Sequence, residues 1–581
     1  MLRWEYGSHS LKLDAAWTHN DAVNVFVQNA LGNYYFDSVA DFQAGRAGSV
    51  ALGGSTTGDL DDIAASFKYD QYTFGLQDSW DATDRLNVTV GTRVDMYGMS
   101  GRPPLNTNFL ARYGFPNTYQ FSGKVVPQPR LGLTWKATDE IELRGGIGLF
   151  AGGTPDVFLG NSFSVPGVFN NAITINRLAA GGCNVPAALC SAALDGISNG
   201  SFAGAVTDYL RTNTASIANA NTNAMTGDYH PASTWKSSLS VDYRPETDWM
   251  GRGWNFGADL YYGFTNWAPI YTDLRLARIG TMPDGRPRYA STVAGNANTD
   301  LLLSNTRKGH SLVAVARANK HFDLGLDLGV SYTFQDVTDV NPMNGTTASG
   351  SYGQTAVIDP NSAAYGTSIY EIRNSLKFNV DFDHAFFGDY KTRFSLFGEK
   401  RSGLPYSLTM NDPNFVNSHS TVFGVAGTSN RFLLYVPNVS SISADSLVSY
   451  DSAATFAAFQ AFVQNNGLKQ GAIVKKNTMR SPSYFKIDLH VDQEIPAPLV
   501  PTGRFKLFAD IENVLNLIDK DWGSLRQVSF PYLASVVNVA CAATAGTNCT
   551  QYRYSSFQNP VLTNQQRFSL WGIRVGARFE F

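Results

Sequence analysis

Several features that would place a chain in a common class are scarce in this sequence. Only 16% of its 581 residues are charged, against roughly 25% in ordinary soluble proteins. No apolar run approaches the ~18 residues that a membrane helix needs. The net charge of −3 gives no basic surface, so we expect no nucleic-acid partner. An aromatic content of 13% with 53 glycines does not suit a disordered chain either.

The first ten residues, MLRWEYGSHS, lack the basic and then apolar segments of a signal peptide. We expect the chain to be the later part of a longer protein.

Motifs of catalytic or metal chemistry are also missing. The eight histidines are scattered, without HExxH spacing. Residues 196–200 match GxSxG by letter, but they lie in a polar stretch rather than between a strand and a helix, which indicates a chance match. Two groups of carboxylates could offer oxygen ligands to Ca²⁺: Asp59, Asp61 and Asp62, and Asp336 with Asp339. Neither group matches an EF-hand loop, so solvated carboxylates are the preferred interpretation. We expect no enzyme, no cofactor and no resident metal.

Cysteine is rare but informative. The four cysteines form two pairs that are close in sequence, Cys183 with Cys190 and Cys541 with Cys549. Zinc binding is the alternative, but neither pair has CxxC spacing or a nearby histidine. We predict two local disulfides in exposed loops, which indicates an oxidising compartment.

What the sequence does contain is a period of two. From Trp571 to the end, Trp571, Ile573, Val575, Ala577, Phe579 and Phe581 alternate with Gly572, Arg574, Gly576, Arg578 and Glu580. A strand points successive side chains to opposite faces, so this segment has one apolar and one polar face. In a lipid bilayer this is the pattern of a barrel strand, apolar toward lipid and polar toward the lumen.

The same alternation recurs along the chain, and Trp4 and Tyr6 resemble the tail of a further strand. We expect strands over 10–18, 71–79, 86–96, 131–135, 141–149, 235–243, 254–264, 311–318, 322–334, 376–383, 392–398, 485–492, 505–511 and 571–581. Two of the expected turns are Asn319-Lys320 and Phe387-Gly388-Asp389. These strands have the length that a tilted strand needs to cross lipid.

Short turns alternate with long connections, such as 152–232. A soluble sandwich gives no reason for this asymmetry, whereas an outer-membrane barrel has short periplasmic turns and long outer loops. The sequence therefore predicts an all-β, transmembrane antiparallel β-barrel of about fourteen spanning strands. We expect it to form one domain over residues 1–581 in the Gram-negative outer membrane, with lipid as a partner.

Charged residues in and beside these strands fall at the alternate positions that point to the polar face. The candidates for the lumen are Arg85, Arg93, Asp95, Arg130, Glu142, Arg144, Asp323, Asp327, Lys377, Asp381, Arg393, Glu399, Lys486, Asp488, Lys506, Asp510, Glu512, Arg574 and Arg578. Their mixed signs favour a cross-strand ladder of opposite charges over a selective ion pore. Ordinary wetting of a polar lumen is the alternative.

Several segments resemble the C-terminal barrel of TonB-dependent outer-membrane receptors, in particular the Oar-like branch. They are 72–95 (YTFGLQDSWDATDRLNVTVGTRVD), 129–155 (PRLGLTWKATDEIELRGGIGLFAGGTP), 504–516 (RFKLFADIENVLN) and the terminal Phe581. Such receptors have a 22-stranded barrel with a plugged lumen. The resemblance implies that this chain lacks the earlier strands, the plug and the segment that contacts TonB. It also implies that Phe579 and Phe581 form a C-terminal membrane-insertion signal for the barrel-assembly machinery.

The resulting hypothesis is a receptor barrel whose outer loops, chiefly 152–232 and 401–482, capture a ligand of the peptide, glycan or siderophore class. A passive pore or surface adhesin without TonB coupling is the alternative. A soluble carbohydrate-binding β protein is a weaker third.

Overall fold

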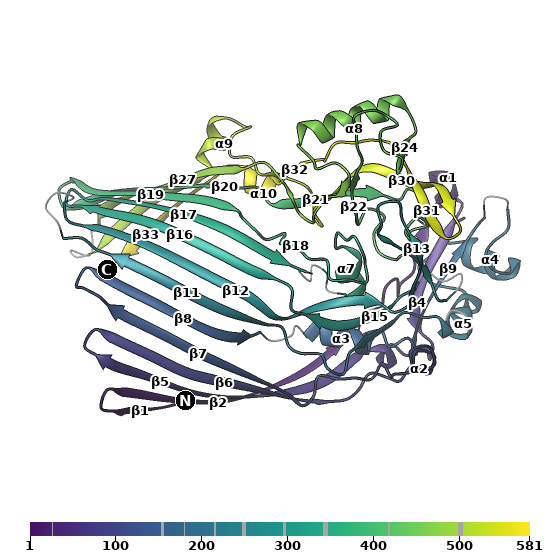
Figure 1. Cartoon of the computed structure of the whole chain (residues 1–581), viewed down its shortest axis with the longest axis horizontal. Coiled ribbons are helices and arrows are strands. Elements are labelled where there is room, and N and C mark those ends of the chain that lie inside the picture. Colours follow the sequence, from purple (N-terminus) through teal and green to yellow (C-terminus); the bar gives the residue numbers. More distant parts are fainter. Residues whose placement is uncertain are drawn as a thin grey trace.

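The computed structural model describes residues 1–25, 27–152, 156–178, 181–213, 217–246, 251–293, 298–340, 345, 347–415, 419–497 and 503–580. Strands that pair in chain order form one long antiparallel sheet, which we call the wall (Figure 1). Each strand is hydrogen-bonded to the next, from β1 at one edge to β33 at the other. The wall comprises β1 (Leu2–Tyr6), β2 (His9–Asn24), β5 (Ala65–Thr83), β6 (Leu86–Ser100), β7 (Lys124–Lys136), β8 (Ile141–Ala151), β11 (Ser233–Tyr243), β12 (Trp254–Asp273), β16 (His310–Phe322), β17 (Leu326–Asp339), β19 (Asn374–Phe387), β20 (Tyr390–Arg401), β27 (Tyr484–Pro496), β28 (Arg504–Glu512) and β33 (Gly572–Glu580).

The wall is open in the described part of the chain. There, β1 pairs only with β2, and β33 pairs only with β28. Three short strands branch from the wall: β10 (Thr222–Met225), β15 (Asp300–Thr306) and β18 (Gly366–Thr367). The last six residues of β12 extend past the wall and pair with β15.

The two ends of the wall differ, as the sequence predicts. Turns of a few residues join β1 to β2, β5 to β6, β16 to β17 and β19 to β20 at one end. Every second connection is long, and the long ones gather at the opposite end, on the right and top of Figure 1. They form a folded layer, which we call the cap.

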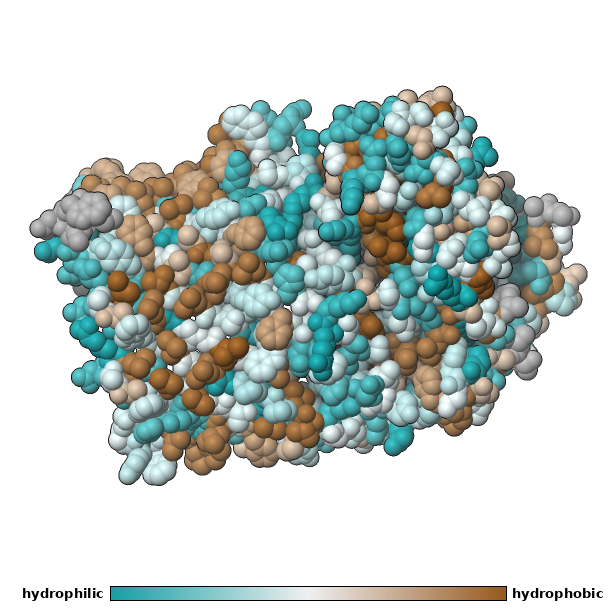
Figure 2. Space-filling view, in the orientation of Figure 1, coloured by the Kyte–Doolittle hydropathy of each residue, from teal (hydrophilic) through white to brown (hydrophobic). Residues whose placement is uncertain are grey.

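The two faces of the wall also differ. The register places Leu13 opposite Leu76 and Leu239 opposite Leu260, so apolar side chains line up across neighbouring strands. These side chains are not covered by protein: Leu239 is 58% and Val575 is 74% exposed. Brown apolar side chains are accordingly spread over the strands in the left half of Figure 2. Such an uncovered apolar surface would promote aggregation in water but suits contact with acyl chains.

Each predicted strand range overlaps a strand of the wall, but one predicted turn is wrong. The sequence places a turn at Asn319-Lys320, whereas β16 continues to Phe322 and the turn is formed by residues 323–325. Gly325 adopts φ +86°, which glycine tolerates best. The alternation of Asp323, Leu324 and Gly325 made this turn look like strand. Phe581 lies outside the described residues.

The cap contains small sheets and short helices. Its sheets are formed by β3 (Asn33–Tyr35), β4 (Ser49–Ser55) and β9 (Asn170–Asn176); β13 (Leu276–Thr281) with β14 (Pro287–Ser291); β21 (Pro405–Asn411), β22 (Phe432–Leu433), β24 (Val448–Tyr450), β26 (Met479–Arg480), β30 (Leu533–Ala545) and β31 (Asn548–Ser555); β23 (Tyr435–Val436) with β25 (Ala472–Ile473); and β29 (Arg526–Gln527) with β32 (Thr563–Asn564). The helices are α1 (Val39–Gln43), η1 (Asp61–Ile63), α2 (Thr107–Tyr113), α3 (Asp156–Ser164), α4 (Ala187–Leu194), α5 (Gly204–Thr212), α7 (Ala348–Gly353), α8 (Ala453–Asn465), α9 (Val514–Ile518) and α10 (Gln566–Ser569).

The cap has hydrophobic cores of its own, which the sequence does not predict. The largest cluster joins Leu408, Phe459, Val537 and Tyr552 from two long connections. A second cluster includes Phe67, Tyr271 and Leu301, and a third includes Val50, Ile175 and Leu194. The long connections therefore fold into packed elements. In the described part of the chain, no helix combines the length and apolar character needed to span a membrane.

Candidate functional site

Most of the predicted lumen charges lie on one face of the wall, opposite the apolar side chains. The register aligns them across strands: Arg93 and Asp95 (β6), Arg130 (β7), Glu142 and Arg144 (β8), Asp327 (β17), Lys377 and Asp381 (β19), Arg393 and Glu399 (β20), Lys486 and Asp488 (β27), Lys506, Asp510 and Glu512 (β28), and Arg574 and Arg578 (β33). We call this surface the polar face.

Two predicted members do not lie on the polar face. Arg85 lies in the turn between β5 and β6, and its guanidinium is 2.9 Å from the carboxylate of Asp139 in the next short turn. Asp323 lies in the turn that the sequence misplaced. Both belong to the short-turn end of the wall.

Opposite charges do pair across strands on the polar face. Arg317 of β16 contacts both Asp242 of β11 and Asp259 of β12, and Asp242 also accepts a hydrogen bond from Arg144 of β8. Both aspartate side chains are 9% exposed. Sequence reasoning missed Arg317, Asp242 and Asp259, although their parity against Leu239 and Leu260 could have identified them.

A second group spans the last strands of the polar face. His490 Nδ1 is 2.6 Å from Asp510 Oδ1, and its Nε2 is 3.0 Å from Asp492 Oδ2. Arg574 of β33 donates to the other oxygen of Asp510 at 2.6 Å. The alternation in 485–492 predicts His490 and Asp492 on the polar side of their strand, but they were not among the predicted lumen charges. Because hydrogen-bond donors and carboxylates alternate, these groups tie neighbouring strands together.

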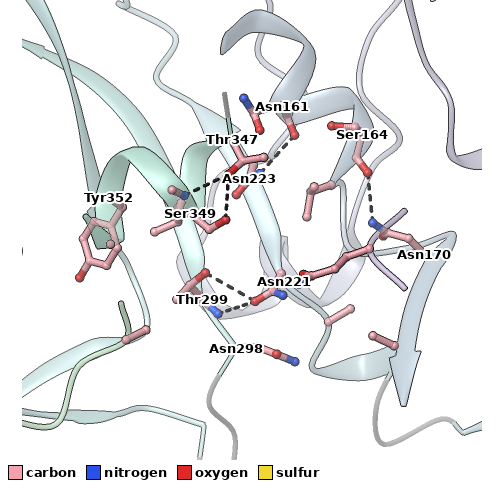
Figure 3. Close-up of a pocket in the computed structure, with 18 of the residues that line it drawn as sticks. Asn161, Ser164, Asn170, Asn221, Asn223, Asn298, Thr299, Thr347, Ser349 and Tyr352 are labelled. Atoms are coloured by element: carbon pink, nitrogen blue, oxygen red, sulfur yellow. Dashed lines mark hydrogen bonds between the residues drawn. The ribbon is translucent and has the colours of Figure 1, made fainter. Parts of the chain in front are cut away.

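The cap holds a pocket of about 660 Å³, a size typical of small-molecule sites. It lies among segments of five long connections: 27–53, 161–223, 298–301, 347–354 and 426–428. Two of these belong to the predicted capture loops 152–232 and 401–482, and the other three were not predicted. Figure 3 shows Tyr352 of α7 and Asn170 of β9 on opposite sides of the pocket.

The lining of the pocket is rich in side-chain amides. Six asparagines and two glutamines line it, with several serines and threonines. Some of these amides hold the pocket lining together: Asn170 Nδ2 donates to the Ser164 carbonyl at 3.1 Å, and the Thr299 backbone amide donates to Asn221 Oδ1 at 2.7 Å (Figure 3). No sequence motif links these asparagines, because the chain folds them together from distant connections.

A buried ionic network positions one side of the pocket. Asp300, which lies between two lining residues, binds Arg275 at 2.9 Å and Arg112 at 2.9 Å, and both oxygens are buried. Arg275 also donates to the carbonyl of Ala220, another lining residue, at 2.7 Å. Asp273, at the cap end of β12, accepts the amides of Arg275 and Asp300, and burial raises the pKa of its carboxyl to about 6.

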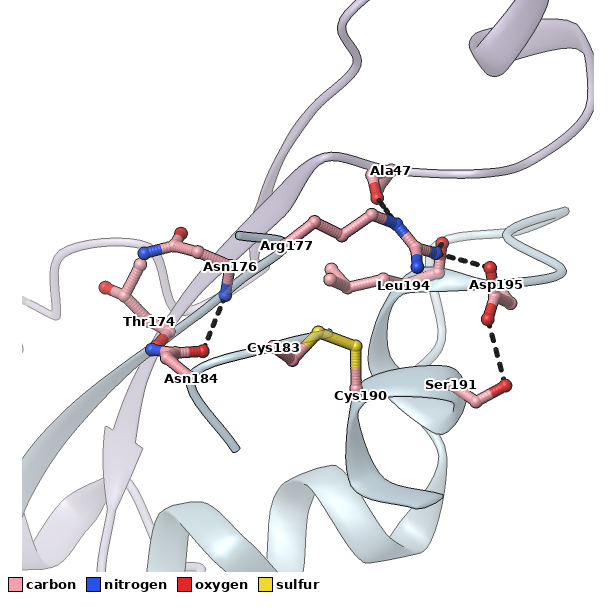
Figure 4. Close-up of a disulfide and its surroundings, with 10 residues drawn as sticks. All are labelled: Ala47, Thr174, Asn176, Arg177, Cys183, Asn184, Cys190, Ser191, Leu194 and Asp195. Carbon is pink, nitrogen blue, oxygen red and sulfur yellow. Dashed lines mark hydrogen bonds and ion pairs between the residues drawn. A yellow bond between two sulfur atoms is a disulfide. The ribbon is translucent and has the colours of Figure 1, made fainter. Parts of the chain in front are cut away.

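Both predicted disulfides are confirmed. Cys183 is joined to Cys190 of α4 beside the β9 segment (Figure 4). Arg177 and Asp195 pair next to it. Burial opposes ionisation of Asp195, but hydrogen bonds from Ser191 and Arg177 outweigh it and lower its pKa.

The second disulfide joins Cys541 of β30 to Cys549 of β31 across a hairpin. The expectation that both pairs lie in exposed loops holds in part: residues 542–548 are exposed, but Cys190 is 6% and Cys549 is 2% exposed, and each of these two belongs to a cap core. The bridges therefore fasten packed cap elements. The described residues contain no cluster of metal-ligating side chains.

Comparison with known proteins identifies the family. Residues 1–519 match the model of the outer membrane beta barrel domain. The chain belongs to this family. This barrel domain is therefore an outer-membrane protein, and its uncovered apolar face is the surface that such a domain presents to lipid.

Solved structures similar to this barrel domain are outer-membrane transporters and receptors. The transporter YddB from Escherichia coli matches at 11% identity and TM-score 0.45, over 92% of this chain and 50% of that one. A mutant of the ferric enterobactin receptor PfeA from Pseudomonas aeruginosa matches at 10% identity and TM-score 0.43, over 98% and 51%. The FrpB iron transporter from Neisseria meningitidis matches at 9% identity and TM-score 0.38, over 88% and 50%. The chain spans about half the length of these structures, and no curated protein matches it.

Proposed function

We propose that the chain is the barrel of a receptor that binds a ligand in its cap and imports it across the outer membrane. Energy coupling comes from a plug and a TonB-contacting segment that these residues do not include, as the resemblance of 72–95, 129–155 and 504–516 implies. The barrel-assembly machinery inserts the domain through its C-terminal signal, with Phe579 on the apolar face beside Phe505.

The observation that carries this proposal is the cap pocket. It lies at the end of the wall where the long connections gather, which in an outer-membrane barrel faces outward. A passive pore needs no folded cap with its own cores and no pocket enclosed by five connections. The polar face then provides a wetted route from the cap to the short-turn end. No catalytic role forms part of the proposal.

The test uses the native gene in its own cells. Strains with and without the gene are incubated in a defined mixture of neutral oligosaccharides, short peptides and a ferric catecholate. Mass spectrometry of the medium then follows depletion, with and without a protonophore. We expect one class of compound to be depleted only when the gene is present and the membrane is energised.

Three outcomes contradict the proposal. Equal depletion by both strains removes the transport role. Gene-dependent depletion that survives the protonophore indicates a passive pore. Gene-dependent retention of a compound on the cell surface without uptake indicates an adhesin.

A further inference from the structure

We propose that the cap pocket binds an uncharged, hydroxyl-rich ligand, a short oligosaccharide. This inference rests on the proposed receptor function and names its ligand class. It is drawn from the chemistry of the lining side chains, their unused hydrogen-bonding groups and the small size of the apolar residues between them.

Charge is the first argument. None of the described residues that line the pocket is Lys, Arg, His, Asp or Glu. A ligand with a net charge would lose its hydration on entry without gaining an ion pair, and that loss is costly. Recognition of carboxylates or phosphates normally uses arginine or lysine. An anionic iron chelate is therefore a poor match, whereas a neutral ligand enters without this cost.

The lining amides match hydroxyl groups. An asparagine or glutamine side chain carries two donors and an acceptor oxygen, and a hydroxyl both donates and accepts. Asn221 uses its oxygen for the Thr299 backbone. Two other acceptors, Asn170 Oδ1 and Gln354 Oε1, are buried and have no hydrogen-bond partner among the described residues. An unsatisfied buried acceptor costs free energy, and a side-chain rotation that turns either oxygen toward a ligand hydroxyl would recover that cost.

The apolar part of the lining argues against a peptide. Apart from Val27, Val165, Leu301 and the ring of Tyr352, its non-polar members are alanines and glycines. Such a surface has no deep apolar recess for the large side chains that anchor peptides. Small residues do allow a compact polar ring to approach the backbone and the amides closely. The pocket volume, about 660 Å³, suits a short oligosaccharide rather than a polymer.

The experiment measures binding of the purified full chain, in lipid nanodiscs, to a panel of neutral oligosaccharides, with short peptides and a ferric catecholate alongside. Gln354→Glu places a charge in the pocket and removes an amide donor. Ser349→Phe fills the pocket from an exposed position on α7. The matched control is Gln558→Glu, an exposed cap amide outside the pocket whose Nε2 donates to the Ser535 carbonyl at 3.1 Å.

At least one oligosaccharide is expected to bind the wild type, and both pocket variants should weaken it by about tenfold or more. Gln558→Glu should change binding by less than about twofold. Retarded migration of the unheated protein on a denaturing gel verifies that each variant keeps its barrel fold.

Two results overturn the ligand class: no oligosaccharide binds, or only a peptide or the ferric catecholate binds and the pocket variants abolish that binding. Oligosaccharide binding that survives both pocket variants overturns the site. Failure of the receptor function looks different. In that case the purified chain binds oligosaccharide through the pocket, but cells with and without the gene deplete it equally.

Discussion

The strongest test of the membrane assignment introduces an arginine, in separate variants, at two adjacent residues of β11. Leu239 lies on the apolar face and is 58% exposed, opposite Gly145 and Leu260. Ser238 lies on the polar face and is the sixth of the eleven residues of β11. Since a strand rises about 3.3 Å per residue, both side chains lie close to the middle of the bilayer. Leu239→Arg and Ser238→Arg therefore add the same charge at the same depth on opposite faces.

The expected magnitudes differ because the two faces meet different solvents. An arginine on the lipid face near the midplane costs about 2–4 kcal/mol, whereas an arginine on the lumen face stays in contact with water and costs less. The folding equilibrium of Leu239→Arg should then fall by about 30-fold to 1,000-fold. The polar face around Ser238 already holds the charged Asp259 and Arg317, so an added guanidinium finds acceptors and water there.

The assay is reversible unfolding by guanidinium in phospholipid vesicles, followed by tryptophan fluorescence, for the wild type and both variants. The ratio between the variants is the decisive quantity, because it removes effects common to any arginine. Equal destabilisation, or a larger loss in Ser238→Arg, would refute the assignment of the faces and with it the contact between wall and lipid.

Three further predictions concern single groups. Arg317→Met should destabilise the wall by about 2 kcal/mol, because it leaves Asp259 without its donor and Asp242 with Arg144 alone; the further change Asp259→Asn should restore most of the loss in the same unfolding assay. Asp273→Asn should stabilise the cap at about pH 8 but not at about pH 4. The pKa of the Asp273 carboxyl is about 6 in the folded state and about 3.9 in the unfolded state, so ionising this carboxyl destabilises the fold by at most about 3 kcal/mol as the pH increases through this window. Limited proteolysis across pH measures the stability of the cap, and equal gains at both pH values would contradict the prediction. Cys541→Ser should cost the cap about 2.5 kcal/mol through the lost eight-residue loop closure; proteolysis should cut near Cys549 sooner, while the wall keeps its gel migration.

The wall could be predicted from the sequence because each of its strands carries a local signal. Alternation over a few residues fixes the face of every side chain, and turn residues fix where a strand ends. This logic located β33 and placed Arg574 and Arg578 on its polar face. It failed at Asp323–Gly325, where alternation continues through the turn itself, so that only the glycine's positive φ distinguishes turn from strand.

The cap could not be predicted in the same way, because its contacts are not local. Its largest core joins Leu408 of β21 and Phe459 of α8, from the connection between β20 and β27, with Val537 of β30, from the connection between β28 and β33. No repeating pattern of apolar residues along the chain indicates such contacts. The cysteine pairs were found from spacing alone, but their burial was not, since it depends on the packing of α4 and β31 into these cores.

The pocket is a consequence of this non-local packing. Leu301 and Tyr352 belong to the second cap core, Gly53 follows a residue of the third, and Ala426 follows a residue of the first. The pocket therefore lies where three packed clusters meet, and its amides are held by elements with little freedom to move. A site built in this way is preorganised, so binding loses less conformational entropy than capture by flexible loops would. Selectivity should then depend on the relative placement of the three cores, and substitutions that loosen any one of them should weaken ligand binding without touching the pocket itself.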